Sequence, residues 1–294
     1  SWPKPRRRLP RVMGLFLVDK PAGPTSFDVL RQLRPALGRK LGHAGTLDPF
    51  ATGLLLVLAG GDTRIATYLS GLDKSYRAVV QLGASSDTLD GEGDLRPTGA
   101  NTDETSLRAA AAAMTGVIEQ RVPMASAVRV AGERSHARMR RGETAAPPPR
   151  PVRIDRLDVT GFDPREQRAT IEVACSKGTY VRQIAADLGE ATGAGGYCLQ
   201  LRRLTIGSFS VDDAGTPEQI AASPAGRWQL SARQALSHLP ERMLDDDELE
   251  HVSHGRALPP AGEAGPVRLV HDGALVAVAT PGERGLQPTM VLAR

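Results

Sequence analysis

A single carboxylate lies in a stretch of tightly constrained backbone, directly ahead of an apolar run. Residues 42–53 are Gly-His-Ala-Gly-Thr-Leu-Asp-Pro-Phe-Ala-Thr-Gly, and the apolar residues 54–58 follow at once. Glycine admits positive φ or close approach to a ligand, and proline fixes the turn just after the acid. We therefore predict that Asp48 lies on a rigid loop beside a buried element, a common place for chemistry. The alternative is an aspartate that only caps or turns its own backbone.

The spacing of apolar residues predicts strands that alternate with helices. Runs of apolar and β-branched residues predict strands, and apolar residues at helical spacing behind a capping Thr or Ser predict helices. We expect strands at 13–18, near 40, and at 76–82, 153–159, 169–174 and 197–209, with helices at 26–37, 63–70, 105–115, 180–191 and 216–222. The Gly- and Asp-rich residues 87–99 predict a solvated loop, because their acids do not have the spacing of an EF-hand.

Composition limits the kind of protein. The 294 residues allow one large domain, alone or with a small one, and a hydrophobic content of 40% suffices for a packed core. No apolar run approaches the ~20 residues of a membrane helix, and the basic N-terminus has no apolar signal core, so we expect a cytoplasmic protein. Two cysteines are too few for a disulfide framework or a zinc cluster, and His251 and His254 have no third ligand nearby, so no metal site is expected.

The charge pattern favours a polyanionic partner. The net charge is +4 with a pI near 9.3, and arginine supplies nearly all of the positive charge. An arginine-rich genome would give the same composition. Aromatic residues make up only 4% of the chain, which disfavours an RNA site built on many stacked aromatics.

Three regions differ in composition from the main body of the chain. Residues 1–11 predict a flexible basic arm. Residues 129–150 hold six arginines and a triple proline, and they predict either an arginine-rich excursion that contacts phosphate or an exposed loop. In residues 239–294, an acidic helix start at 245–248 and two strands flanking a hairpin signal at 271–273 predict a small β unit.

Five motifs occur in the order and spacing of one family. Residues 42–49 resemble the catalytic signature of the TruB family of tRNA pseudouridine(55) synthases, of bacterial type. The other motifs are the opening segment at 18–26, the tyrosine motif at 74–78, a third motif at 175–182 and the pocket-closing strand at 201–204. One such motif would be weak, but five in order over residues 12–210 are specific. The C-terminal part matches more loosely.

The resemblance implies a fold and an activity. The fold is the α+β pseudouridine synthase fold: a mixed, mainly antiparallel sheet flanked by helices in a catalytic domain at 12–238, plus a PUA-type RNA-binding domain at 239–294. The activity is isomerisation of uridine 55 in the T-loop of tRNA, with the target nucleotide turned out of its stack. No cofactor, metal or protein partner is implied. The tRNA elbow would lie along 129–150 and the C-terminal domain. Relatives that act with guide RNAs carry longer extensions, so we expect a stand-alone monomer.

The resemblance also assigns the catalytic residues. Asp48 matches the catalytic aspartate, a nucleophile or base. Whether it attacks the sugar, attacks the base or abstracts a sugar proton is left open. Arg182 matches the position that pairs with this acid, and we predict a contact that keeps Asp48 ionised. Tyr76 matches the tyrosine that packs on the target base. Without the resemblance, Arg182 would be a solvated charge on a helix and Tyr76 a core residue.

The remaining substrate-binding positions implied by the resemblance are His43, Tyr180, Leu201 and Lys20. The histidine would enter the RNA stack, the tyrosine and leucine would line the pocket, and the lysine would support the pocket or touch phosphate. The chain departs from the family pattern at Ala125 and His136, where aromatic residues are usual in the RNA-gripping region. These departures affect tRNA contact rather than the chemistry.

Two other functions were weighed against the enzyme. The first is a non-catalytic RNA-binding protein on the same scaffold, which loss of Asp48 or Tyr76 would favour; both are present. The second is an unrelated hydrolase with an aspartate nucleophile, which would need a partner acid or a metal cluster, and none stands out in the sequence.

Overall fold

The computed structural model describes residues 12–123, 129–130, 133–134, 147–260, 262 and 264–292. The predicted basic arm at 1–11 lies outside the described residues. So does most of the arginine-rich excursion, including Ala125 and His136. Within the excursion, only the short paired strands β8 (Arg129–Val130) and β9 (Glu133–Arg134) and the segment from 147 onward are described.

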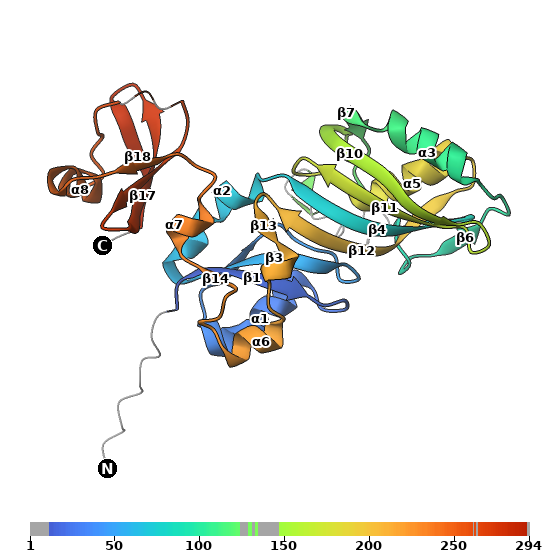
Figure 1. Ribbon diagram of the computed structural model, residues 1–294, viewed down its shortest axis with the longest axis horizontal. Coiled ribbons are helices and arrows are strands. Elements are labelled where there is room, and N and C mark those ends of the chain that lie inside the picture. Colours follow the sequence, from blue (N-terminus) through green and yellow to red (C-terminus); the bar gives the residue numbers. More distant parts are fainter. Residues whose placement is uncertain are drawn as a thin grey trace, which may run out of the picture.

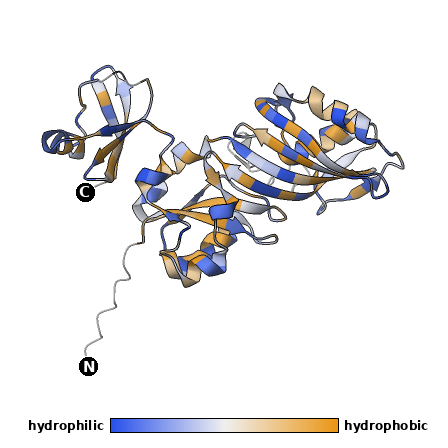
Figure 2. Cartoon of the chain, in the orientation of Figure 1, coloured by the Kyte–Doolittle hydropathy of each residue, from blue (hydrophilic) through white to orange (hydrophobic). Residues whose placement is uncertain are grey.

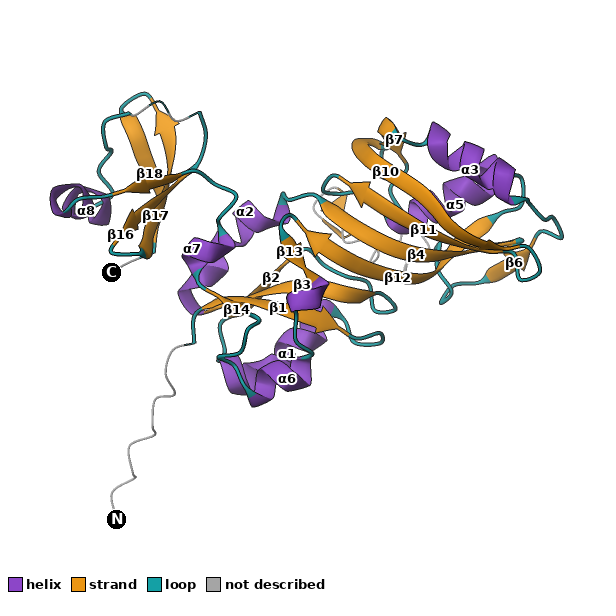
Figure 3. Ribbon diagram, viewed as in Figure 1, coloured by secondary structure: helices purple, strands orange, loops and turns teal. Residues whose placement is uncertain are grey.

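Ten strands of the described residues form one long twisted sheet (Figures 1 and 3). The strands are β1 (Gly14–Lys20), β2 (Leu41–Ala44), β3 (Thr52–Ala59), β4 (Lys74–Leu82), β7 (Gly116–Gln120), β10 (Arg150–Asp163), β11 (Arg168–Cys175), β12 (Gly196–Ile206), β13 (Phe209–Ser210) and β14 (Gln229–Leu230). Their order is β14-β1-β3-β12-β4-β11-β10-β7, with β2 on β3 and β13 on β12. Only β3 and β12 pair in parallel, so the predicted mixed, mainly antiparallel sheet is confirmed.

Helices cover both faces of the sheet. They are α1 (Ser26–Leu37), α2 (Ala66–Ser70), α3 (Glu104–Ala113), α5 (Val181–Ala191), α6 (Pro217–Ala222), α7 (Ala232–Ala235) and the 3₁₀ turns η1 (Gly60–Ile65) and η2 (Val211–Asp213). Capping boxes begin α1 at Thr25 and α6 at Thr216, as the sequence predicts. The helix predicted at 63–70 is divided between η1 and α2.

The apolar run after the Asp48 loop is buried on both faces. Leu55 and Val57 of β3 pack with α1 and α6, while Leu54, Leu56 and Leu58 pack with α2 and α7. A strand covered on both faces has no solvent side, so its sequence is continuously apolar. The outer strands differ: Figure 2 shows hydrophilic and hydrophobic residues alternating along β4, β10 and β11, where α3 and α5 cover one face. Burial of each leucine stabilises the fold by ~1.5–3 kcal/mol. This burial fixes the strand on which the Asp48 loop ends.

A second, four-stranded sheet forms near the C-terminus, as predicted. It contains β15 (Glu241–Met243), β16 (Val267–His271), β17 (Ala274–Gly282) and β18 (Gly285–Val291), and α8 (Asp246–Ser253) packs against it. The sheet lies beside α2 and α7 (Figure 1). Val270 and Met290 share a hydrophobic cluster with Leu15 of the main sheet, and Arg64 donates to the carbonyl of Val291 at 2.6 Å. The small sheet therefore packs against the main domain through α7, α2 and η1.

The expectation of a solvated loop at 87–99 is wrong in part. Strand β6 (Leu95–Pro97) pairs with β5 (Ala84–Ser86), and Asp90 is buried with 5% exposure. The carboxylate of Asp90 accepts from the amide of Glu92 at 3.1 Å and from the hydroxyl of Thr88 at 2.6 Å. These bonds, together with a bridge between Asp90 and Cys198 of β12, fold the segment back onto the sheet.

Gly53 allows a test of how closely the Asp48 loop approaches the sheet where the two join. Its φ is +102°, and a Cβ at this position would lie 2.2 Å from the carbonyl oxygen of Arg203. Gly116 has a similar φ of +103° with nothing within 4 Å of its Cβ position, so it is a matched control. Gly116→Ala should lower the free energy of unfolding by ~1–2 kcal/mol through backbone strain alone. Gly53→Ala should lower it by ~1–3 kcal/mol more, through overpacking. Equal losses in urea unfolding would contradict the close approach.

Candidate active site

A cavity of about 240 Å³ opens where the loop before β3 faces the start of α5. Five of the seven residues that the sequence predicts for the site line it: Asp48, Tyr76, Tyr180, Arg182 and Leu201. They come from the loop, from β4, from α5 and from β12, which are far apart in the sequence. The sheet supplies the floor and α5 one wall.

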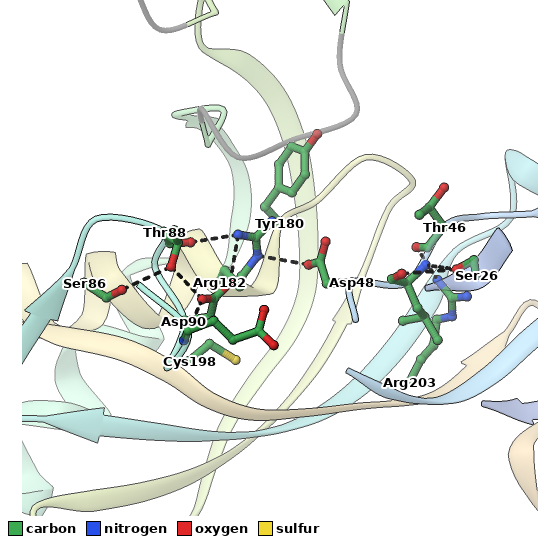
Figure 4. A network of polar contacts seen from close by, with 12 residues as sticks. Ser26, Thr46, Asp48, Ser86, Thr88, Asp90, Tyr180, Arg182, Cys198 and Arg203 are labelled. Atoms are coloured by element: carbon green, nitrogen blue, oxygen red, sulfur yellow. Dashed lines mark hydrogen bonds and ion pairs between the residues drawn. The ribbon is translucent and has the colours of Figure 1, made fainter. Parts of the chain in front are cut away.

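Asp48 is held by a buried arginine that it shares with a second acid (Figure 4). The Nε of Arg182 lies 3.0 Å from Oδ2 of Asp48, so the predicted contact is present. The Nη1 of Arg182 lies 3.2 Å from Oδ2 of Asp90 and donates to the carbonyl of Thr88 at 2.7 Å. The side chains of Arg182 and Asp90 are 4% and 7% exposed, whereas that of Asp48 is 38% exposed. The arginine is thus fixed from behind, and the carboxylate of Asp48 faces the cavity.

Burial raises the pKa of Asp48 above its ordinary value, and the charge of Asp90 adds to the rise. The Arg182 cation opposes both effects. A raised pKa makes this carboxylate easier to protonate than a carboxylate in water. Perturbed pKa values of this kind are common among groups that react with a substrate.

Lys20 anchors the loop that carries Asp48. Its side chain is fully buried, and its ammonium group donates to the carbonyls of Pro21 at 2.8 Å, Pro49 at 3.1 Å and Ala51 at 2.7 Å. Burial lowers the pKa of Lys20 to about 8. The resemblance allows Lys20 either to support the pocket or to touch phosphate. The geometry favours support of the pocket, because a fully buried ammonium does not reach a phosphate.

Arg203 of β12 holds the other side of the loop. Its guanidinium donates to the carbonyls of Leu54 at 2.7 Å and Gly45 at 2.9 Å. It stands directly across from Tyr76 of β4 in the sheet, and its charge and hydrogen bond oppose the rise that burial causes in the pKa of Tyr76. The tyrosine is 7% exposed and remains a neutral hydroxyl at the floor of the cavity.

Tyr180 is fixed at the start of α5 by a buried amide. The side chain of Gln120 accepts from the Tyr180 amide at 2.8 Å and donates to its carbonyl at 3.0 Å, and Gln120 is 1% exposed. The guanidinium of Arg150 lies 5.0 Å from the centre of the Tyr180 ring and donates to the carbonyl of Gly178. The tyrosine therefore forms an outer wall of the cavity that also carries a cation.

His43 is not among the described residues that line the cavity. It lies on β2, paired with Val57 of β3. Burial, and secondarily the charge of Arg203, lowers the pKa of His43, so its ring is neutral at pH 7. His43 and Lys20 are thus the two predicted site residues that do not line the cavity.

Three residues of the site have no role assigned from the sequence. The sequence predicts Asp90 in a solvated loop and contains Arg203 only as part of a motif. It has no pattern that points to Gln120. The double arginine in strand 201–204 is the one usable sign, because charge inside an otherwise apolar strand requires a buried partner. Within the described parts of the chain, no group of three or more His, Cys, Asp or Glu could hold a metal ion. No helix there is long and apolar enough to cross a membrane.

Known proteins resemble this chain in sequence and in fold. The family model described as TruB family pseudouridylate synthase (N terminal domain) matches residues 34–181, and that described as tRNA Pseudouridine synthase II, C terminal, matches 239–293. The tRNA pseudouridine synthase B of Arthrobacter sp. (strain FB24) is 40% identical, over 95% of this chain and 96% of its own. That of Thermobifida fusca (strain YX) is 40% identical, over 95% and 98%.

Solved structures agree on the fold. An H/ACA RNP bound to a substrate RNA containing 2′-deoxyuridine matches with a TM-score of 0.74 at 21% identity, over 96% of this chain and 85% of that one. An archaeal box H/ACA sRNP Nop10–Cbf5 complex matches with a TM-score of 0.70 at 21% identity, over 99% and 91%. Together the family match and the fold define a pseudouridine synthase. The chain belongs to the TruB family and is an isomerase that converts uridine to pseudouridine in tRNA.

Asp90 should set the acid limit of activity. If turnover requires ionised Asp48, activity falls as the pH drops through the raised pKa of that carboxyl. Asp90→Asn removes a charge that raises this pKa, so the acid limb of the rate–pH profile should move to lower pH. The maximal rate should also fall ~100-fold, because Arg182 loses part of its positioning. Asp94→Asn, at an exposed acid of the same loop, should leave the profile unchanged. A slower Asp90→Asn enzyme with an unmoved acid limb would contradict this account.

Proposed function

We propose that this enzyme modifies position 55 in the T-loop of tRNA, with Asp48 as the catalytic nucleophile or base and with the target nucleotide turned out of its stack. One observation carries the proposal: a half-exposed carboxylate, held at 3.0 Å by buried Arg182, borders a cavity floored by Tyr76 and Leu201. Such a cavity admits a flipped base and excludes the rest of a folded RNA.

Each residue of the site has a part in this chemistry. The carboxylate of Asp48 meets the sugar or the base as the glycosidic bond breaks. The detached uracil stays between Tyr76 and Leu201, turns, and rejoins the same sugar carbon through its C5. Tyr180 closes the cavity on the outside, and Arg182 keeps the acid ionised and aimed. His43, beside the cavity on β2, enters the RNA stack in place of the flipped nucleotide.

The proposed substrate contact extends beyond the cavity. The tRNA elbow lies along the arginine-rich excursion and the small C-terminal domain, where Arg150 already places a cation at the cavity edge. We divide the chain at residue 239, where the second family match also begins. The enzyme acts as a cytoplasmic monomer without a protein partner or a cofactor.

The proposal is tested by tritium release from tRNA transcripts labelled at uracil C5. Wild type should release tritium in an amount equal to one site per tRNA, and Asp48→Asn should reduce the rate at least ~10⁴-fold because the nucleophile or base is lost. Asp94→Asn is the matched control and should release tritium normally. Mapping by reverse transcription after carbodiimide treatment, which leaves a bulky adduct on pseudouridine, should give a single carbodiimide-dependent stop, one nucleotide 3′ to position 55.

Two results would contradict the proposal. A stop elsewhere in the tRNA would move the target out of the T-loop. Absence of release by wild type, with tRNA binding intact, would favour a non-catalytic RNA-binding protein.

A further inference from the structure

Two cations belong to the floor of the cavity. Tyr76 of β4 stands across from Arg203 of β12 in the sheet, and Ala78 stands across from Leu201. Alternate residues of a strand point to the same face. Lys74, two residues before Tyr76, therefore shares this face. Lys74, Tyr76, Leu201 and Arg203 all line the cavity, so a base that lies on the tyrosine lies beside both cations.

The positive charge of these two side chains is only partly offset: the carboxylate of Asp73 raises the pKa of Lys74, but burial and the charge of Arg203 have larger effects in the opposite direction. Arg203 is 1% exposed and Lys74 is 9% exposed. Arg203 donates to backbone carbonyls, and the ammonium of Lys74 donates to those of Ser70, at 3.2 Å, and Leu72. No carboxylate in the described part of the chain forms an ion pair with either. By contrast, Arg182 shares its charge with two acids, on the other side of Asp48 (Figure 4).

The two cations converge on one point. A Cβ on Gly45 would lie 3.6 Å from Nη1 of Arg203 and 3.6 Å from Cε of Lys74. Gly45 has a φ of +89° and leaves this space open at the cavity edge. Burial and then the charge of Arg203 lower the pKa of Lys74 to about 8, so the ammonium is largely protonated at pH 7. Two positive charges held together in a poorly solvated site attract an anion strongly.

The proposed reaction creates an anion at this place. When the bond between C1′ and N1 breaks, its electron pair stays on uracil and spreads over N1 and the ring oxygens. The base then attacks C1′ through C5, which returns an electron pair to the sugar, and the C5 proton leaves while N1 takes one up. Atoms and electrons balance without an oxidant or reductant. If Asp48 adds to the base instead, negative charge again appears on uracil.

We propose that Lys74 and Arg203 form a pair that stabilises the uracil anion, an inference that rests on the function proposed above. Fixed charges act most strongly where charge develops in a water-poor site, because they need no reorganisation. The pair explains why two cations that form no ion pair among the described residues lie buried beside the base-binding tyrosine. Asp48 and Arg182 serve the sugar side, and the pair serves the leaving base.

Lys74→Met tests the pair, because methionine keeps the length of the side chain and removes its charge. Arg203 holds the catalytic loop, so its replacement would disturb more than charge. Lys40→Met is the matched control: Lys40 is exposed and lies outside the cavity. Single-turnover rates are measured with tRNA that carries uridine or 5-fluorouridine at the target, and products are quantified by mass spectrometry of nucleosides. Fluorine withdraws electrons and stabilises the departing base by itself.

Lys74→Met should slow the reaction of uridine ~100-fold, and its loss on 5-fluorouridine should be at least tenfold smaller. Its affinity for tRNA and its melting temperature should match those of Lys40→Met. Equal losses of rate on both substrates, or an unchanged rate on uridine, would overturn the proposed pair. Conversion of uridine by wild type in the same experiment would leave the proposed function standing. A weaker affinity with an unchanged bound-state rate would also overturn it and indicate a phosphate contact. Failure of wild type to convert uridine would overturn both.

Discussion

The ion pair between Arg182 and Asp48 depends on a third residue, and much of the structure serves that dependence. A buried guanidinium is stable only when its charge and its N–H groups are satisfied. Asp90 and the carbonyl of Thr88 supply this from the segment between β5 and β6. That segment is held at the site by the bridge between Asp90 and β12 and by the bond from Thr88 to the same carboxylate. Arg182 is therefore fixed before any substrate arrives, and its Nε faces the carboxylate of Asp48.

The main sheet was predictable because its strands leave strong patterns. The apolar run at 54–58 predicts a buried element, and the structure buries both of its faces. Helices α1 and α6 begin at capping boxes that the sequence displays. The Asp48 loop was also predictable from local sequence, because glycines and a proline restrict its backbone. Local patterns therefore gave the elements and the place of Asp48.

The other half of the site was not predictable in this way. Asp90 lies among exposed acids, and only its contacts with Arg182 and β12 distinguish it from them. Gln120 acts by replacing backbone partners at Tyr180, sixty residues away. The full burial of Lys20 follows from three carbonyls that meet only in the folded chain. These are tertiary hydrogen bonds of polar residues. The positions of such residues follow no periodic pattern from which the bonds could be predicted.

The cavity has two electrostatic ends, and closure by RNA would strengthen the contrast between them. Asp48 is still 38% exposed in the free protein. A nucleotide that covers this carboxylate removes the remaining water, and loss of water raises the pKa of an acid further. The Arg182 cation, whose Nε lies 3.0 Å from the carboxylate, opposes this rise in the pKa. The same loss of water strengthens the field of Arg203 and Lys74, which form no ion pair with an acid in the described structure. Under the proposed function, covering the site strengthens both ends together and links substrate binding to chemistry without any change of fold.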